Sequence, residues 1–279
     1  MNKGPRQRFS SALAVLAISV VCIIAIIPVL WGLVTSLKPT EQILTFPPQW
    51  IPWPISLDSF EKVLYQSNVL LYFRNSVIVT VASLVVSLSL AIHAAYGLSR
   101  FKFWGHSAIL IGVLTTSMIP GVAILVPLYG LSVKTGLYDT FLGLILVYSA
   151  WNVPILIWLM KGFFDKVPIE LEEAALVDGA SRWRVFYQIV LPLSQPGLVS
   201  GAIMVVMFVW NDFVIGFALT ISEERRPLSV GLYTYISNYG VEWGQLMAAT
   251  VIALTPVLLV FLLLQRRLVE GLAAGAIKG

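Results

Sequence analysis

The sequence predicts an all-α, polytopic membrane protein with six transmembrane helices. Three observations predict this fold class: 58% of the 279 residues are hydrophobic, only 11% are charged, and the apolar residues gather in six long runs. A soluble domain carries about 25% charged residues, which cover its outer surface. This chain lacks the polar residues that a soluble surface of its size requires. We therefore expect one transmembrane domain over residues 1–279.

Each apolar run is long enough to cross a bilayer, whose hydrocarbon core of about 30 Å needs roughly 20 apolar residues of helix. The first run follows a basic stretch, as a secretory signal would. Its apolar core is longer than that of a signal and no Ala-x-Ala site follows, so we interpret it as a retained span. The third run contains Pro120, Gly121 and Pro127, which predict a kink or a break. The predicted spans cover residues 11–37, 77–98, 107–133, 140–160, 197–219 and 246–265.

The distribution of lysine and arginine predicts the orientation. With the N-terminus inside, the inner segments hold twelve of these residues and the outer segments hold six. The excess of positive charge in cytoplasmic loops favours this orientation. It places residues 1–10, the loop 161–196 and the tail 266–279 in the cytoplasm, and the aromatic, proline-rich loop 38–74 outside.

The loop 161–196 has the pattern of two short helices. Pro168 suits the first turn of a helix, and three glutamates follow it near the positive end of the helix dipole. Gly179 is expected to end this helix in a left-handed conformation, and Ser181 to cap a second helix that Leu191-Pro192 stops. From periodicity alone, two interpretations stay open: an amphipathic connector on lipid headgroups, or a docking site for a partner.

A longer motif in this loop resembles a known family. The run Glu173-Ala174-Ala175-Leu176-Val177-Asp178-Gly179-Ala180, followed by Phe186, Ile189, Leu191-Pro192 and Pro196, resembles the EAA loop of ABC importer permeases. The stretches 95–101, 136–140 and 208–213 resemble the carbohydrate-importer group. Nearly the whole chain is similar to the smaller, six-span permease subunit of maltose-type importers, which implies a type I ABC importer permease fold with a cytoplasmic EAA coupling loop.

The resemblance implies which residues contact an ATPase. In this family the EAA loop forms a coupling helix seated in a cleft of the cytoplasmic ATPase, and a small-faced helix suits such a cleft. The tail resembles a C-terminal extension that reaches toward the ATPase interface through Gly271, Gly275 and Lys278, and a disordered end is the alternative. The implied coupling residues are Glu173, Ala174, Ala175, Asp178, Gly179, Leu191 and Pro192.

The same resemblance implies the partners and the location. A second permease subunit would complete a heterodimer, and two ATPase subunits and an extracellular or periplasmic solute-binding protein would join it in a bacterial or archaeal cytoplasmic membrane. The chain has no Gly-x-x-x-x-Gly-Lys-Ser/Thr run to cradle a phosphate, so ATP and Mg are expected on the partner subunits. We therefore predict that this chain is not an enzyme and binds no cofactor.

Polar residues inside predicted spans are candidate functional groups because burying them in lipid is costly. Trp210, Asn211 and Asp212 lie together in the fifth span. They either line a route for sugar hydroxyls or pack against the sister subunit, and both interpretations stay open. His93 is expected to form an interhelical hydrogen bond, and His106 to be solvated. With no other histidine in the chain, no metal site is expected.

The predicted function is translocation of a sugar or sugar derivative as part of an ATP-driven importer. The same architecture carrying a glycerol phosphodiester or a sugar phosphate is an alternative. A self-sufficient secondary transporter or channel is disfavoured by the EAA loop and by the shortage of charged residues in the spans. A membrane-embedded enzyme is disfavoured because no acid, base or metal set is evident.

Overall fold

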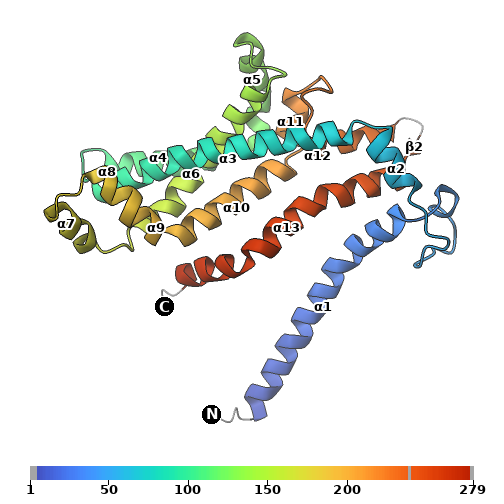
Figure 1. Cartoon of the computed structure of the whole chain (residues 1–279), viewed down its shortest axis with the longest axis horizontal. Helices are drawn as coiled ribbons and strands as arrows, with labels where there is room; N and C mark the ends of the chain where they lie inside the picture. The colour runs from blue at the N-terminus through green and yellow to red at the C-terminus, as the bar shows by residue number, and fades with distance from the viewer. Residues whose placement is uncertain (1–4, 238–239, 277–279) are drawn as a thin grey trace. The chain divides into compact units, whose positions relative to one another are not determined.

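The computed structural model describes residues 5–237 and 240–276 (Figure 1), with side chains described for 13–237 and 240–262. The chain divides into two compact units. The first comprises Met1–Val69 and Leu232–Thr255, and the second comprises Leu70–Gly231 and Pro256–Gly279.

Helices dominate both units. The described residues also include one hairpin of two strands, each two residues long. The long helices are α1 (Pro5–Ser36), α3 (Val69–Arg100), α6 (Phe141–Phe164), α10 (Gln195–Asn211) and α13 (Trp243–Ala276). The shorter helices are α2 (Asp58–Tyr65), α4 (His106–Ser117), α5 (Gly121–Lys134), α7 (Ile169–Val177), α8 (Arg182–Val185), α9 (Leu191–Leu193), α11 (Val214–Leu219) and α12 (Leu228–Gly231). The remaining elements are the 3₁₀ turns Thr40–Gln42 and Leu232–Tyr235, the π turn Phe186–Val190, and strands β1 (Ile236–Ser237) and β2 (Gly240–Val241).

The first unit holds α1 and the loop that follows it. The apolar side chains of α1 are exposed from Leu13 to Leu30 within the chain, as expected of a helix that faces lipid or another subunit. Lys38, just beyond this helix, is buried with its ammonium 4.3 Å from the centre of the Trp31 ring. Trp31 also meets Trp50 edge to face, so the aromatic, proline-rich loop folds back on the end of α1.

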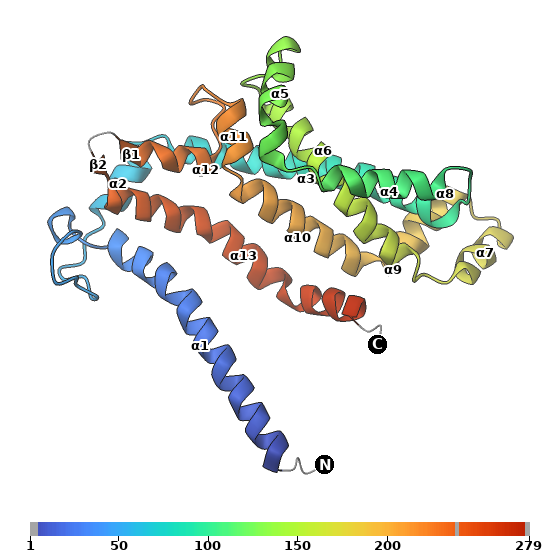
Figure 2. The ribbon, with the colours of Figure 1, turned by 180° about the vertical axis from the view of Figure 1, so that it is seen from behind.

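The second unit is built around α3, α6 and α10, which run side by side in Figures 1 and 2. Their contact residues form one buried apolar cluster that includes Leu144, Leu156 and Val205. Gly197 permits the close approach of α10 to α6, because a Cβ there would lie 2.5 Å from the Phe163 ring.

Four helices of the described chain are long and apolar enough to cross a membrane, or up to six if each of two bent pairs counts as one span. The single helices are Leu13–Ser36, Val69–Arg100, Phe141–Phe164 and Trp243–Leu262. The third predicted span is broken as its prolines indicated, because α4 and α5 meet at 92°. The second begins eight residues earlier than predicted, at Val69 rather than residue 77.

The fifth predicted span needs correction. Residues 197–219 do not form one helix, because α10 ends at Asn211 and α11 begins at Val214. The bent pair that passes the length and composition test joins Arg182–Leu193 to Gln195–Asn211 at 76°. The loop predicted at 161–196 is correspondingly shorter, from Asp165 to Ser194, because α6 and α10 extend into it.

Candidate functional site

The segment Asp165–Ser194, which we call the elbow, begins with α7 and turns sharply at Gly179. Gly179 has φ +88°, which confirms the predicted left-handed helix end. Its N–H bonds to the Leu176 carbonyl at 3.1 Å, and the Ala180 N–H bonds to the Ala175 carbonyl at 2.9 Å. These two bonds satisfy carbonyls that the end of α7 would otherwise leave unpaired.

The second half of the elbow is a helix with one wide turn. The Ser181 side chain accepts a hydrogen bond from the Arg184 N–H at 3.3 Å and caps α8, as the sequence predicted. The chain then makes a π turn over Phe186–Val190, where the Leu191 N–H bonds to the Phe186 carbonyl. Pro192 has no N–H and its ring would clash with the carbonyl four residues back, so the wide turn accommodates it. The helix ends at Leu193, slightly later than predicted.

The inner side of α7 is held by a buried ion pair that the sequence analysis missed. The Glu172 carboxylate meets Arg100 Nε at 2.5 Å, and the two side chains are 8% and 9% exposed. Tyr96 donates a further hydrogen bond to Glu172 at 2.8 Å. The helical spacing could have predicted that Glu172 faces the protein. Glu172 lies three residues before Ala175, and residues three apart share a helix face. Ala175 packs against the buried apolar cluster.

The outer side of α7 is exposed. Glu173 and Ala174 are exposed, and Val177 is 87% exposed. Ile169, Glu173 and Val177 follow one another at intervals of four, so they share this face. Exposed apolar residues beside acidic ones are typical of a protein-binding surface. Of the two alanines expected on such a surface, Ala174 faces outward, whereas Ala175 is half-buried against the protein itself.

The other implied contact residues lie in different places. Asp178 is exposed beside Gly179 at the tip of the elbow. Leu191 is half-buried and Pro192 is exposed. In the tail, Gly271 and Gly275 lie within the helical backbone of α13, and Lys278 lies outside the described residues. The structure thus brings Glu173, Ala174, Asp178 and Gly179 together on one segment.

The second candidate set, Trp210 to Asp212, lies at the break between α10 and α11. Trp210 is buried and meets the Phe73 ring edge to face at 5.5 Å. Asn211 is exposed, and its amide donates to the Met207 carbonyl of its own helix at 2.7 Å.

Asp212 has internal partners at this break. One of its carboxylate oxygens accepts hydrogen bonds from the Ile215 and Gly216 N–H groups, at 2.9 and 3.2 Å. The Asp212 carbonyl accepts a further bond from the Ser229 hydroxyl at 2.5 Å. Capping of this kind starts a new helix, which explains why the span is interrupted here.

The segment after α11 is hydrogen-bonded to α3 and to the connection that precedes α6. The buried Asn75 amide donates to the carbonyls of Glu224 and Arg226, each at 3.0 Å. Asp139, with φ +57°, accepts from the N–H groups of Ile221 and Ser222 at 3.0 and 3.1 Å. Burial alone would raise the pKa of Asp139, but these hydrogen bonds and the charge of Arg225 outweigh burial and lower it.

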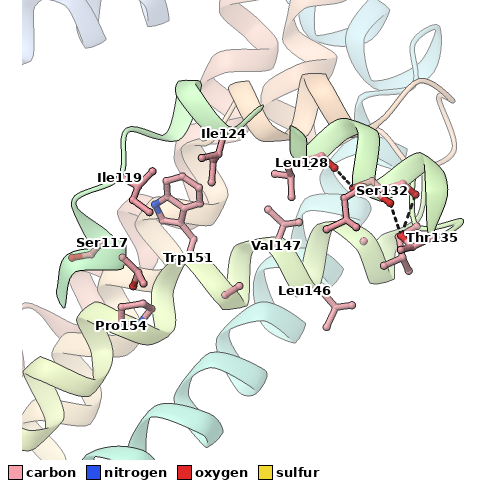
Figure 3. Close-up of a pocket in the computed structure, with 15 residues that line it drawn as sticks. Ser117, Ile119, Ile124, Leu128, Ser132, Thr135, Leu146, Val147, Trp151 and Pro154 are labelled. Atoms are coloured by element: carbon pink, nitrogen blue, oxygen red, sulfur yellow. Dashed lines mark hydrogen bonds between the residues drawn. The ribbon is translucent and has the colours of Figure 1, made fainter. Parts of the chain in front are cut away.

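A cavity of about 380 Å³ opens between α4, α5 and α6 (Figure 3). Trp151 projects into it between Ile119 and Ile124. The hydroxyls of Ser117 and Ser132 donate to carbonyls of their own helices, at 2.7 and 2.9 Å. Most of the other lining side chains are apolar.

The two histidines are accounted for by hydrogen bonds. His93 Nε2 lies 2.8 Å from the Tyr187 hydroxyl, so the predicted interhelical hydrogen bond is present. His106 Nε2 lies 2.7 Å from the Leu98 carbonyl rather than being simply solvated. Within residues 5–237 and 240–276, no three His, Cys, Asp or Glu side chains gather as a metal site would require.

Sequence relatives cover nearly the full chain. Residues 83–273 match the family described as binding-protein-dependent transport system inner membrane component. The probable ABC transporter permease protein YurM of Bacillus subtilis is 35% identical over 256 residues, which cover 90% of this chain and 83% of YurM. The diacetylchitobiose uptake system permease protein NgcG of Streptomyces coelicolor is 35% identical, over 92% of this chain and 85% of NgcG. The trehalose/maltose transport system permease protein MalG of Thermococcus litoralis is 33% identical, over 96% of each chain.

Solved structures share the fold. A chain of a bacterial ABC transporter involved in the import of the acidic polysaccharide alginate matches with a TM-score of 0.82 at 21% identity, over 95% of this chain and 99% of that chain. A chain of the methionine ABC transporter MetNI matches with a TM-score of 0.56 at 18% identity, over 76% and 97%. These likenesses confirm the type I ABC importer permease fold. The family match and the full-length relatives show that this chain belongs to the binding-protein-dependent transport system inner membrane components, the permease subunits of ABC transporters.

Proposed function

We propose that this chain is one of two permease subunits of an ATP-driven importer and that α7 seats in a cleft of a cytoplasmic ATPase. The exposed face of α7 carries the proposal. Glu173 and Ala174 point away from the protein, while the left-handed turn at Gly179 and the ion pair of Glu172 fix the helix in place. A helix presented in this way loses little conformational entropy when a partner binds it.

The cargo proposed is a carbohydrate delivered by a solute-binding protein. The relatives named above for diacetylchitobiose and for trehalose or maltose support this class. A glycerol phosphodiester or a sugar phosphate is the alternative that the uptake experiment below distinguishes. ATP and Mg would be held by the ATPase subunits, because this chain has no phosphate-cradling motif.

The orientation proposed has the elbow and both termini in the cytoplasm. The twelve inner and six outer basic residues support it. In this orientation the tail residues Gly271, Gly275 and Lys278 lie on the ATPase side, where we propose that they contact the ATPase. The exposed Asn211 is the residue of the second set that we propose for the translocation route, and Asp212 positions it through the helix break.

The test is a reconstituted complex of this chain with its partner permease, ATPase subunits and binding protein. Uptake of labelled trehalose, maltose, diacetylchitobiose, glycerophosphocholine and glucose 6-phosphate identifies the cargo class. Ala174→Trp should reduce co-purified ATPase, because its bulk fills the outer face of α7 without disturbing the protein's core. The matched control is Leu142→Trp. Leu142 is exposed at the N-terminal end of α6, whereas the elbow follows the C-terminal end of that helix. Wild-type ATPase binding by Ala174→Trp contradicts the proposed docking face.

A further inference from the structure

The Arg100 side chain joins four segments of the second unit at one point. Arg100 is the last residue of α3, and its guanidinium bonds to the Phe164 and Val167 carbonyls at 2.9 and 3.1 Å. It also donates to Glu172 and to the Ser99 hydroxyl. The end of α3, the end of α6, the start of the elbow and α7 therefore share a single cation.

The environment of this junction makes its bonds difficult to exchange for water. Both charged side chains are less than one-tenth exposed. Tyr96, which donates to the second Glu172 oxygen, packs edge to face on Phe164 and 4.7 Å from the Phe186 ring centre. A buried charge that loses its partner is strongly destabilised, so neither group can part from the other without a large cost.

A second bridge beside the junction is much more exposed. Asp165 accepts from the Ser99 hydroxyl at 2.6 Å and pairs with Lys161 at 2.7 Å. The Asp165 side chain is 43% exposed, and pairs of this kind contribute little. A third contact, between His93 Nε2 of α3 and the Tyr187 hydroxyl of the elbow at 2.8 Å, is also exposed and joins no charged pair. Among these three contacts, the buried ion pair is the one that water and salt weaken least.

We infer that Arg100 and Glu172 form the mechanical joint through which displacement of α7 moves α3 and α6. Both are positioning residues, and the inference rests on the proposed role of α7 as the ATPase contact. Because the guanidinium holds two backbone carbonyls and a carboxylate in fixed directions, α7 cannot tilt independently of the two long helices. Apolar packing alone would allow α7 to slide, since it has no directional bonds.

The experiment compares two variants of the reconstituted complex. Glu172→Gln removes one charge and leaves Arg100 unpaired. The double variant Arg100→Met with Glu172→Met removes both charges together, so neither charge is left buried without the other. It also removes the partners of the Tyr96 hydroxyl and of the Phe164 and Val167 carbonyls. For each variant, three quantities are measured: co-purified ATPase, thermal stability, and sugar molecules transported per ATP hydrolysed, with the disaccharide that the uptake panel selects.

The joint predicts a specific result for the double variant. Thermal stability should fall because buried polar groups lose their partners. ATPase binding by the assembled complex should stay near wild type, while sugar transported per ATP falls about fivefold or more, the usual lower range of coupling between sites. Lys161→Gln, which removes only the exposed bridge, is the control and should keep the wild-type ratio. If the assembled double variant binds the ATPase and transports with the wild-type ratio, Arg100 and Glu172 serve folding only. Failure of the wild-type chain to bind the ATPase would instead overturn the proposed function.

Discussion

Tyr148 of α6 donates a hydrogen bond to Asp212, with 2.9 Å between the two oxygens, and so ties the break between α10 and α11 to the buried cluster. Tyr148 is 1% exposed, and the same Asp212 oxygen receives two backbone N–H groups of α11. These bonds within the chain hold the break between α10 and α11 in place.

Replacement of Asp212 should lower stability. Asp212→Ala removes a helix cap, at a cost of about 0.5–2 kcal/mol, and leaves the Tyr148 hydroxyl without its acceptor, at a further cost of about 1–3 kcal/mol. Thermal unfolding of the detergent-solubilised complex measures the loss. Because Tyr148 and Asp212 act together, adding Tyr148→Phe to Asp212→Ala should cost less than the sum of the single changes.

Asn211→Ala is the matched comparison at the same break. The Asn211 side chain is exposed and its amide donates to a carbonyl of its own helix, so we expect near-wild-type melting. If Asn211 lines the route, sugar uptake per assembled complex should nevertheless fall. Normal uptake by Asn211→Ala would remove this residue from the proposed route. In the preceding test, additive losses of stability from Tyr148→Phe and Asp212→Ala would show that the hydrogen bond between the two side chains is not important.

Substitutions at Gly179 should weaken ATPase binding or transport, and the size of the loss should depend on the side chain. A Cβ at Gly179 meets no atom within 4 Å, so the cost arises from the positive φ alone, about 1–2 kcal/mol. Gly179→Val should impair ATPase binding or transport most, Gly179→Ala less, and Gly179→Asn least, because asparagine tolerates the left-handed region. The measurements are co-purified ATPase and binding-protein-stimulated hydrolysis.

The control for this series is Gly162→Ala in α6. A Cβ there also meets open space, and Gly162 has no positive φ. Full ATPase binding and full transport by Gly179→Val would mean that the turn does not position the elbow.

Asp139 should make stability depend on pH at the acid end. Its folded-state pKa lies below the ordinary value of 3.8, so its contribution is fully present above that value and is lost as the pH falls through the folded-state pKa. Asp139→Asn should therefore lower the melting temperature at about pH 6 and flatten the decline between about pH 5 and pH 3. Asparagine suits the left-handed backbone of this position, so backbone strain is not added. A variant that melts with the wild-type acid profile would contradict this role.

The proposed orientation can be checked by cysteine labelling in intact cells. In a Cys22→Ala background, an impermeant maleimide should modify Glu61→Cys and Glu224→Cys, whose side chains are exposed in segments assigned to the outside. It should not modify Arg6→Cys or Lys278→Cys until the membrane is permeabilised. Labelling of either terminus from outside would reverse the orientation.

Local patterns in the sequence predicted the long helices, the break at Pro120 and the turn at Gly179, because each depends on hydrophobic length or on backbone conformation. The buried ion pair escaped prediction because Arg100 and Glu172 lie far apart in the chain, and each residue alone resembles an ordinary surface charge. The start of α3 at Val69 escaped prediction for the same reason. The polar Asn75 suggested that the helix begins after it, but Asn75 lies within the helix and bonds to the distant carbonyls of Glu224 and Arg226. The break at Asp212 was hidden inside an otherwise continuous apolar run.

The wide turn over Phe186–Val190 has a consequence for how relatives of this chain can change in length. A deletion of one residue there would restore an ordinary helical pitch and bring the Pro192 ring against the carbonyl of the preceding turn. The wide turn holds one residue more than an ordinary helical turn, and Pro192 is what requires it. Replacement of Pro192 alone would leave this extra residue without a structural role. The proline and the extra residue are therefore expected to be gained and lost together during evolution, as a single heritable change.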